Sequence, residues 1–174
     1  MMKKEINWIY KVFLMTFCLS VVFSFASNAI TTHANLIVMI IINFLVIVIG
    51  IVFDMIGTAT LTSNEAAFHA KSSRKLKGAK ESISLIKNSH KVASVCNDVI
   101  GDICGIISGG MGAIVSISLA SFFGINTTLA SILVSSVISS LTVGGKAYFK
   151  TIAIKNCDKI VFIAGKLKSI LKLS

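Results

Sequence analysis

The sequence predicts an all-α integral membrane protein with four transmembrane helices. Its mean hydropathy is +0.88. Of the 174 residues, 55% are hydrophobic and 14% are charged, compared with roughly 25% charged in soluble domains. Four apolar stretches are long enough for the ~20 helical residues that cross a bilayer core. The chain contains no proline, so no proline kink interrupts a helix.

The predicted spans cover residues 9–30, 36–61, 99–123 and 127–154. Each is assigned to a helix because a bilayer offers no water to backbone N–H and C=O groups, which a helix satisfies internally. The first span has a second interpretation. Lys3, Lys4, the apolar run and the small residues at 27–29 also fit a secretory signal peptide with its cleavage site. Cleavage there would remove this span.

The basic residues predict the orientation. All 17 Lys and Arg fall within residues 3–11, 71–91 and 146–172, whereas the connections 31–35 and 124–128 carry no charged residue. Loops rich in Lys and Arg stay on the cytoplasmic side of a membrane. We therefore expect a multi-pass protein of the cell membrane, with both termini and the 62–97 connection in the cytoplasm.

The 62–97 connection and the tail at 161–174 are predicted to be basic amphipathic helices. In the connection, an apolar stripe among the basic residues is formed by Leu76, Ala79, Ile83, Ile86 and Val92. Such a helix suits a surface of anionic lipid, which is the expected partner. Simple anchoring of the topology is the alternative. Nucleic acid is not an expected partner, because the membrane accounts for the positive charge.

Polar groups gather near the predicted cytoplasmic ends of the spans. An ionisable residue within a span is costly and usually has a partner or a role. Carboxylate, amide and hydroxyl oxygens are the ligands that Mg²⁺ prefers over softer donors. We therefore predict a divalent-cation site formed by Asp54, Ser63, Glu65, Asn97, Asp98 and Asp102. For Asp98 and Asp102, solvation at the membrane edge is the alternative. No cofactor is expected.

The third predicted span carries a seam of small residues. Gly101, Gly105 and Gly109 lie on one helical face and form two overlapping GxxxG motifs, which let helix backbones approach closely. We expect this seam to pack against a helix of the same chain or of a second copy.

The second and fourth spans carry polar side chains of their own. Asn43, deep in the second span, is expected to make a hydrogen bond to another helix. The fourth span has a stripe of hydroxyl groups, for which helix packing and the lining of a polar cavity are both open: Ser131, Ser135, Ser139 and Thr142.

Motifs of membrane-embedded and nucleotide-dependent enzymes are absent from the sequence. The tetrad that ends at Asp102 reads Val-Ile-Gly-Asp, not the Gly-x-Gly-Asp of membrane aspartyl proteases. Residue 106 is isoleucine where the Gly-x-Ser-Gly of a membrane serine protease would begin. No P-loop or dinucleotide fingerprint occurs. We therefore expect the protein not to be an enzyme.

Three segments together resemble the transmembrane domain of the CNNM/CorB magnesium transporters. They are SNEAAFHAKSSRKLKGAKESISLIKN at 63–88, NDVIGDICGIISG at 97–109 and GGKAYFKTIA at 144–153. The resemblance covers residues 36–160 and implies a dimeric divalent-cation transporter or channel, for Mg²⁺ or Co²⁺. It implies that Ser63 and Glu65 match the turn after the family's first core span. The amide motif of the family's next span corresponds to one of Asn97, Asp98 and Asp102, and the register is left open.

On this basis the chain divides into three parts. Residues 1–35 form an extra span or signal peptide, residues 36–160 a CorB-like transmembrane domain, and residues 161–174 the basic tail. The family's regulatory CBS-domain pair is expected to be missing.

Lys146 marks the main departure from the family, since it stands where the last family motif has a glutamate. It either pairs with an acid as a tethered cation in place of a metal, or extends to the headgroups, as lysines near helix ends do. The lost acid favours a second function, a degenerate transporter fold that acts as a membrane scaffold or partner-binding subunit. The retained Glu65, Asp98 and Asp102 favour transport.

Overall fold

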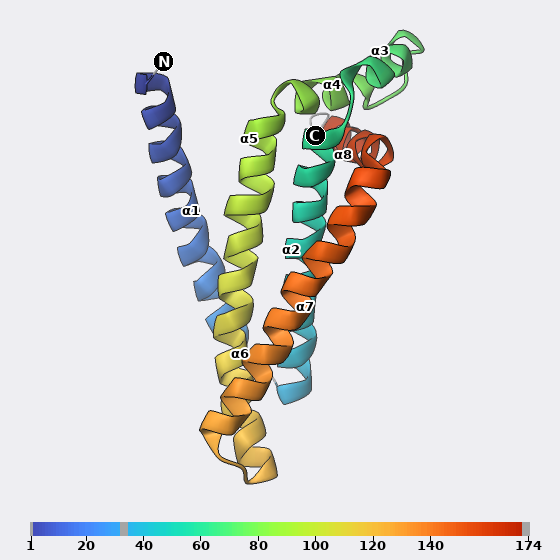
Figure 1. Ribbon diagram of the computed structural model, residues 1–174. Coiled ribbons are helices and arrows are strands. Elements are labelled where there is room, and N and C mark those ends of the chain that lie inside the picture. Colours follow the sequence, from blue (N-terminus) through green and yellow to red (C-terminus); the bar gives the residue numbers. More distant parts are fainter. Residues whose placement is uncertain (1, 32–34, 172–174) are drawn as a thin grey trace. The chain divides into compact units, whose positions relative to one another are not determined.

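The computed structural model describes residues 2–31 and 35–171, and this part of the chain is helical with no strand (Figure 1). The elements are α1 (Met2–Thr31), α2 (Leu36–Thr62), α3 (Glu65–Ser73), α4 (Ala79–Lys87), α5 (Ser89–Ala93), η1 (Ser94–Gly101), α6 (Asp102–Phe123), α7 (Thr127–Lys155) and α8 (Cys157–Leu171). The predicted all-α class is therefore confirmed.

Four helical segments of the described chain are long and apolar enough to cross a membrane, which confirms the predicted number. They are Trp8–Phe25, Leu36–Thr62, Ser89–Phe123 and Thr127–Lys155. The third begins at Ser89, earlier than predicted, because α5, η1 and α6 follow one another without a break. The predicted cleavage motif at 27–29 lies within α1. The connection predicted at 31–35 includes residues 32–34, which lie outside the described part.

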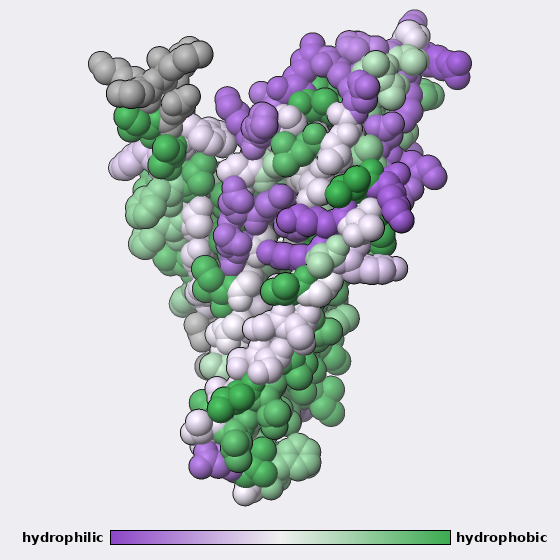
Figure 2. Space-filling view, in the orientation of Figure 1, coloured by the Kyte–Doolittle hydropathy of each residue, from purple (hydrophilic) through white to green (hydrophobic). Residues whose placement is uncertain are grey.

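The chain folds as two compact units. Unit 1 comprises Met1–Gly50 and Val99–Gly145, and unit 2 comprises Ile51–Asp98 and Lys146–Ser174. Figure 2 shows hydrophobic residues over the spans of unit 1 and hydrophilic residues gathered over α3 and α4 of unit 2. These surfaces suit a lipid environment for unit 1 and a polar one for the helices that follow α2.

Unit 1 is built around one face of the third span. Side chains four residues apart share a helical face, and here they form a buried row: Val99, Ile103, Ile107 and Met111. α1 and α2 pack against this row with Val12, Leu19, Ile42 and Val46. α6 thus serves as the central helix of the unit.

Unit 2 has a separate core to which four helices contribute. Its fully buried members, each 0% exposed, are Ala59 of α2, Phe68 of α3, Ala153 of α7 and Val161 of α8. α4 lies alongside α8, and the Ser82 hydroxyl lies within hydrogen-bonding distance of the Val161 carbonyl at 3.2 Å. A Cβ on Gly165 would overlap Ser82 Oγ, so glycine at this position permits the close approach of α8 to α4.

The 62–97 connection forms short helices rather than a single amphipathic one. α3 begins at the N-cap Asn64, whose side-chain oxygen accepts a hydrogen bond from the Ala66 amide at 3.0 Å. The chain then turns through Lys75 (φ 53°) and through Gly78 (φ 92°), the N-cap of α4, both in the left-handed region that a continuous helix does not contain. A single helix through this connection is therefore ruled out by the backbone.

The α4 part of the predicted apolar stripe faces protein. Ala79 is fully buried, and Ile83 and Ile86 pack against the core of unit 2, whereas Leu76 is 47% exposed. A lipid-facing position is therefore wrong for the three α4 residues, because α8 packs against α4. In the predicted tail it is α8 that exposes apolar side chains, at Ile163 and Leu167 among others. Residues 172–174 of the tail lie outside the described part.

Candidate functional site

The second half of α2 places a carboxylate and a hydroxyl on one helical face. Asp54 and Thr58 lie about one turn apart, so their side chains project from the same side of the helix. Both are buried, with Asp54 retaining 4% and Thr58 9% of full exposure. Because a buried polar group is unfavourable without a partner, what these two groups contact decides what the region can do.

Asn97 of η1 approaches this part of α2 at Gly57. A Cβ on Gly57 would overlap Asn97 Oδ1 and would lie 3.2 Å from Cys96 Cβ. Gly57 directly precedes Thr58 and follows Asp54 by three residues. Glycine therefore allows the amide oxygen to lie against the segment of α2 that carries the carboxylate and the hydroxyl.

η1 is a π-helix, which the sequence did not predict. π-helical turns are rare and occur frequently at functional sites, because the extra residue in each turn changes the direction of the side chains. Here the π-helical turn carries Asn97 and Cys96, the residues in closest contact with Gly57.

Three oxygens of this region have no hydrogen-bond partner among the described residues. They are Asp54 Oδ2, Thr58 Oγ1 and Asn97 Oδ1, and each has essentially no exposure of its own. Leaving such an atom unpaired costs about 1–3 kcal/mol. A carboxylate, a hydroxyl and an amide oxygen are the ligand types of a hard cation. We refer to Asp54, Thr58 and Asn97 as the oxygen cluster.

Lys150, near the end of α7, is paired with the oxygen cluster. Its Nζ lies 4.0 Å from Asp54 Oδ2, which is an ion pair too long to be a hydrogen bond. The lysine side chain is 51% exposed, whereas that of Asp54 is 6% exposed. The sequence predicts Lys146 either as a tethered cation or as a lysine that extends to the headgroups. Among the described residues it is Lys150, one turn further along α7, that pairs with Asp54.

Two of the predicted ligands have protein partners instead. Glu65 Oε1 lies 2.9 Å from His69 Nε2 and 3.4 Å from Lys87 Nζ. The hydrogen bond with His69 and the nearby Lys87 ammonium lower the pKa of the Glu65 carboxyl. The Ser63 hydroxyl donates to the Ala59 carbonyl at 2.9 Å. Both residues belong to the junction between α2 and α3, where they stabilise local structure.

Asp98 and Asp102, the remaining predicted ligands, are exposed, in unit 2 and unit 1 respectively. Among the described residues, no three His, Cys, Asp or Glu side chains come together as a metal-binding group. Of the six predicted ligands, Asp54 and Asn97 therefore belong to the oxygen cluster. Thr58 and Lys150 are not among the residues predicted from the sequence, although the four-residue spacing of Asp54 and Thr58 is visible there.

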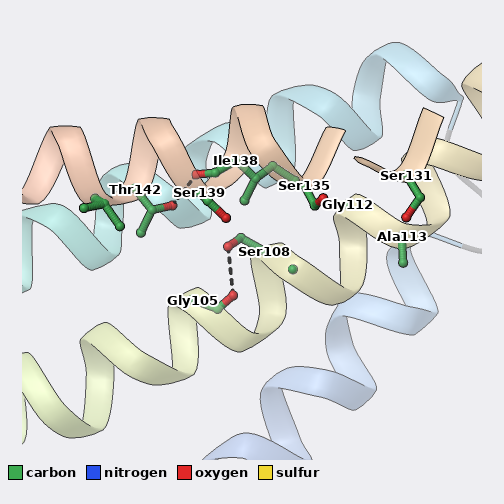
Figure 3. Close-up of a pocket in the computed structure, with 11 residues that line it drawn as sticks. Gly105, Ser108, Gly112, Ala113, Ser131, Ser135, Ile138, Ser139 and Thr142 are labelled. Atoms are coloured by element: carbon green, nitrogen blue, oxygen red, sulfur yellow. Dashed lines mark hydrogen bonds between the residues drawn. The ribbon is translucent and has the colours of Figure 1, made fainter. Parts of the chain in front are cut away.

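Unit 1 contains a separate groove of about 260 Å³ between α6 and α7, lined by apolar surface with a few hydroxyl groups (Figure 3). The hydroxyl stripe predicted in the fourth span lines it: Ser131, Ser135, Ser139 and Thr142. Opposite this stripe lie Ser108 and the glycines of α6. Figure 3 shows Ser139 directed toward Ser108, whose hydroxyl donates to the Gly105 carbonyl at 3.0 Å. The stripe thus borders a groove, but the Ser135 and Thr142 hydroxyls donate to backbone carbonyls of their own helix, so helix packing and the lining of a polar cavity both stay open.

The glycine seam of α6 is largely unpacked within the described chain. A Cβ on Gly105 or Gly109 would meet nothing within 4 Å, so the expected contact with a helix of the same chain is absent at these two positions. Gly101 lies near α2, since its carbonyl oxygen would be 3.8 Å from a Cβ added at Gly50. The close approach of α6 to α7 occurs instead at Gly112, where a Cβ would overlap Ile138 Cδ1.

Asn43 is buried in α2 of unit 1, but its side-chain oxygen has no hydrogen-bond partner among the described residues. The predicted interhelical hydrogen bond is therefore not made by this atom.

Comparison of the sequence with protein-family models and with curated proteins finds no match.

Proposed function

We propose that the protein transports a divalent cation across the cell membrane as a CorB/CNNM-type transporter or channel, with Mg²⁺ favoured and Co²⁺ as the second candidate. The oxygen cluster carries this proposal, because it combines a buried carboxylate with two buried neutral oxygens that have no hydrogen-bond partner in the described chain. Mg²⁺ binds few protein ligands and keeps several waters, so a set of three protein oxygens suits it. The sequence resemblance over residues 36–160 supports the same function.

The proposal makes Asp54 the principal ligand and leaves Glu65 outside the site. Asp54→Asn keeps the side-chain shape but removes the charge, so we expect Mg²⁺ uptake into liposomes containing the purified protein to be lost. Glu65→Gln is the matched control, because it removes a carboxylate that already has His69 and Lys87 as partners. Uptake that survives Asp54→Asn unchanged would exclude the oxygen cluster as the transport site.

A scaffold or partner-binding role without transport is the second candidate function. The ion pair of Lys150 with Asp54 favours it, because an ammonium group neutralises the buried carboxylate without any metal. A scaffold predicts that Mg²⁺ and Co²⁺ leave the melting temperature of the purified protein unchanged. A transporter predicts stabilisation that saturates with the ion.

We further propose a homodimer and an interaction with anionic lipid. For the lipid, the support is α8, where the apolar side chains of Ile163, Leu167 and Ile170 are exposed beside Lys166 and Lys168. A helix of this composition can lie at the headgroup level of a bilayer. Replacement of both lysines by Gln should reduce the stabilisation by phosphatidylglycerol relative to phosphatidylcholine nanodiscs. Equal lipid dependence in the variant would remove this proposal.

A further inference from the structure

Asp54 and Lys150 form an ion pair within unit 2 in which one partner is buried and the other is exposed. The carboxylate is fixed on α2 and nearly inaccessible, with 6% side-chain exposure, whereas the lysine side chain is 51% exposed near the end of α7. A lysine stem can extend along apolar surface and keep its ammonium in water. The Lys150 ammonium can therefore reach solvent without unfolding of α7, whereas Asp54 cannot reach another environment without unfolding of α2.

The 4.0 Å separation leaves the ligand oxygen free. Asp54 Oδ2 accepts no hydrogen bond from Lys150 or from any other described residue, although the ammonium lies close enough to neutralise its charge. A bound metal ion would take the lone pairs of Asp54 Oδ2 and would repel an ammonium at this distance, because the two positive charges interact across a poorly solvated region. The metal and Lys150 are thus mutually exclusive neighbours of Asp54.

We propose that Lys150 is an intramolecular competitor for the divalent cation, holding Asp54 neutralised in the ion-free protein and moving toward solvent when the ion binds. The inference rests on the proposed function, since it concerns the same oxygen cluster. It explains how a buried carboxylate is tolerated between transport events, because an isolated buried charge is strongly unfavourable. It also makes Lys150 a residue that sets the apparent affinity for the ion.

The size of the effect follows from the fraction of molecules in which Asp54 is accessible. The apparent dissociation constant equals the intrinsic value divided by that fraction, so a lysine bound to Asp54 in about nine molecules of ten weakens binding about tenfold. Lys150→Met removes the ammonium and keeps the length of the side chain. Lys150→Arg keeps a positive charge and should retain the competition.

The test is the Mg²⁺ dependence of the melting temperature of the full-length protein in detergent, at constant ionic strength. The expected result is a half-maximal Mg²⁺ concentration about tenfold lower in Lys150→Met than in wild type, with Lys150→Arg close to wild type. Lys146→Met is the matched control, because it removes the same charge one turn away on α7 and should leave the wild-type value nearly unchanged.

The possible outcomes separate this inference from the proposed function. Equal half-maximal concentrations in wild type, Lys150→Met and Lys146→Met would overturn the inference and leave the Mg²⁺ site intact. A response in Lys150→Met alone would support the competition and favour the scaffold role for the wild type. No response in any of these proteins would overturn both. The double variant Asp54→Asn, Lys150→Met should not respond, and a retained response would overturn the assignment of Asp54.

Discussion

Asn97 of the π-helix η1 rests its side-chain oxygen against Gly57 of α2, where a Cβ would overlap it. This contact brings an amide from the third span to the part of the second span that carries Asp54 and Thr58.

The first prediction concerns Gly57→Ala. The added methyl group must displace Asn97, and overpacking of this kind costs about 1–3 kcal/mol.

We expect Gly57→Ala to lower the melting temperature and to weaken the Mg²⁺ response. Alanine usually favours a helix over glycine, so a loss of stability would come from the contact and not from helix propensity. Gly144→Ala in α7 is the control, because a Cβ there meets nothing within 4 Å. If both variants are equally stable and bind Mg²⁺ alike, the contact is unimportant.

The second prediction concerns the packing of α4 on α8. Gly165→Ala places a methyl group against Ser82 Oγ and within 2.6 Å of the Gly78 carbonyl oxygen. Overpacking should cost about 1–3 kcal/mol, and Ser82→Ala should rescue the variant only partly, because the backbone contact with Gly78 remains. Thermal melts of both single variants and the double variant measure this. Full rescue by Ser82→Ala would assign the clash to the hydroxyl alone.

The third prediction separates packing within the chain from assembly. Gly112→Leu should destabilise the protein, because a Cβ there already overlaps Ile138 Cδ1 and lies 3.7 Å from Val134 Cγ1, which leaves no room for a larger side chain. Gly105→Leu should leave the stability of the single chain nearly unchanged, because Gly105 has no neighbour within 4 Å.

Gly105→Leu should also change the oligomeric state, because the glycine seam is the expected contact between the two copies of the proposed homodimer. Close packing of two helices through a glycine seam depends on van der Waals contact, which leucine prevents. Light scattering in detergent should therefore report a shift from dimer to monomer. A dimer that persists in Gly105→Leu would show that the seam is not the contact between copies.

The fourth prediction concerns pH. His69 and Lys87 lower the pKa of the Glu65 carboxyl in the folded protein, with the hydrogen bond to His69 as the largest contribution. A carboxyl with a lowered folded-state pKa stabilises the protein above its unfolded-state pKa. This contribution is lost as the pH falls through the folded-state value.

Melting temperatures measured across the acid range should therefore fall less steeply with decreasing pH in Glu65→Gln than in wild type. The difference should be small, because the pair is exposed to solvent. Identical pH profiles for the two proteins would mean that the pair does not contribute to folding.

The fifth prediction is the topology. Reporter fusions after Lys91 and after Ser174 should both report the cytoplasm, because every cluster of Lys and Arg is expected on that side. A C-terminal reporter found outside the cytoplasm would contradict the four-span orientation.

The sequence alone was sufficient to predict the helical class and the location of the spans. A bilayer imposes a local constraint, since each crossing segment must be apolar and must satisfy its own backbone, and both properties can be read without knowing any contact. The clustering of Lys and Arg in the connections and toward the ends of the spans can be read in the same way. The start of the third span at Ser89 and the turn at Gly78 were not predicted from the sequence, because they depend on contacts with neighbouring elements.

The composition of the candidate site was decided by tertiary structure. The sequence predicts Asp54, Glu65 and Asp98 as ligands of one site, with solvation as the alternative for Asp98. Packing buries Asp54, pairs Glu65 with His69, and leaves Asp98 exposed. The sequence leaves open whether Lys146 pairs with an acid or extends to the headgroups, whereas in the structure Lys150 of α7 lies beside Asp54. The reason is physical: a carboxylate in a sequence has the same chemistry everywhere, and only its neighbours determine whether it is solvated, paired or left with free lone pairs.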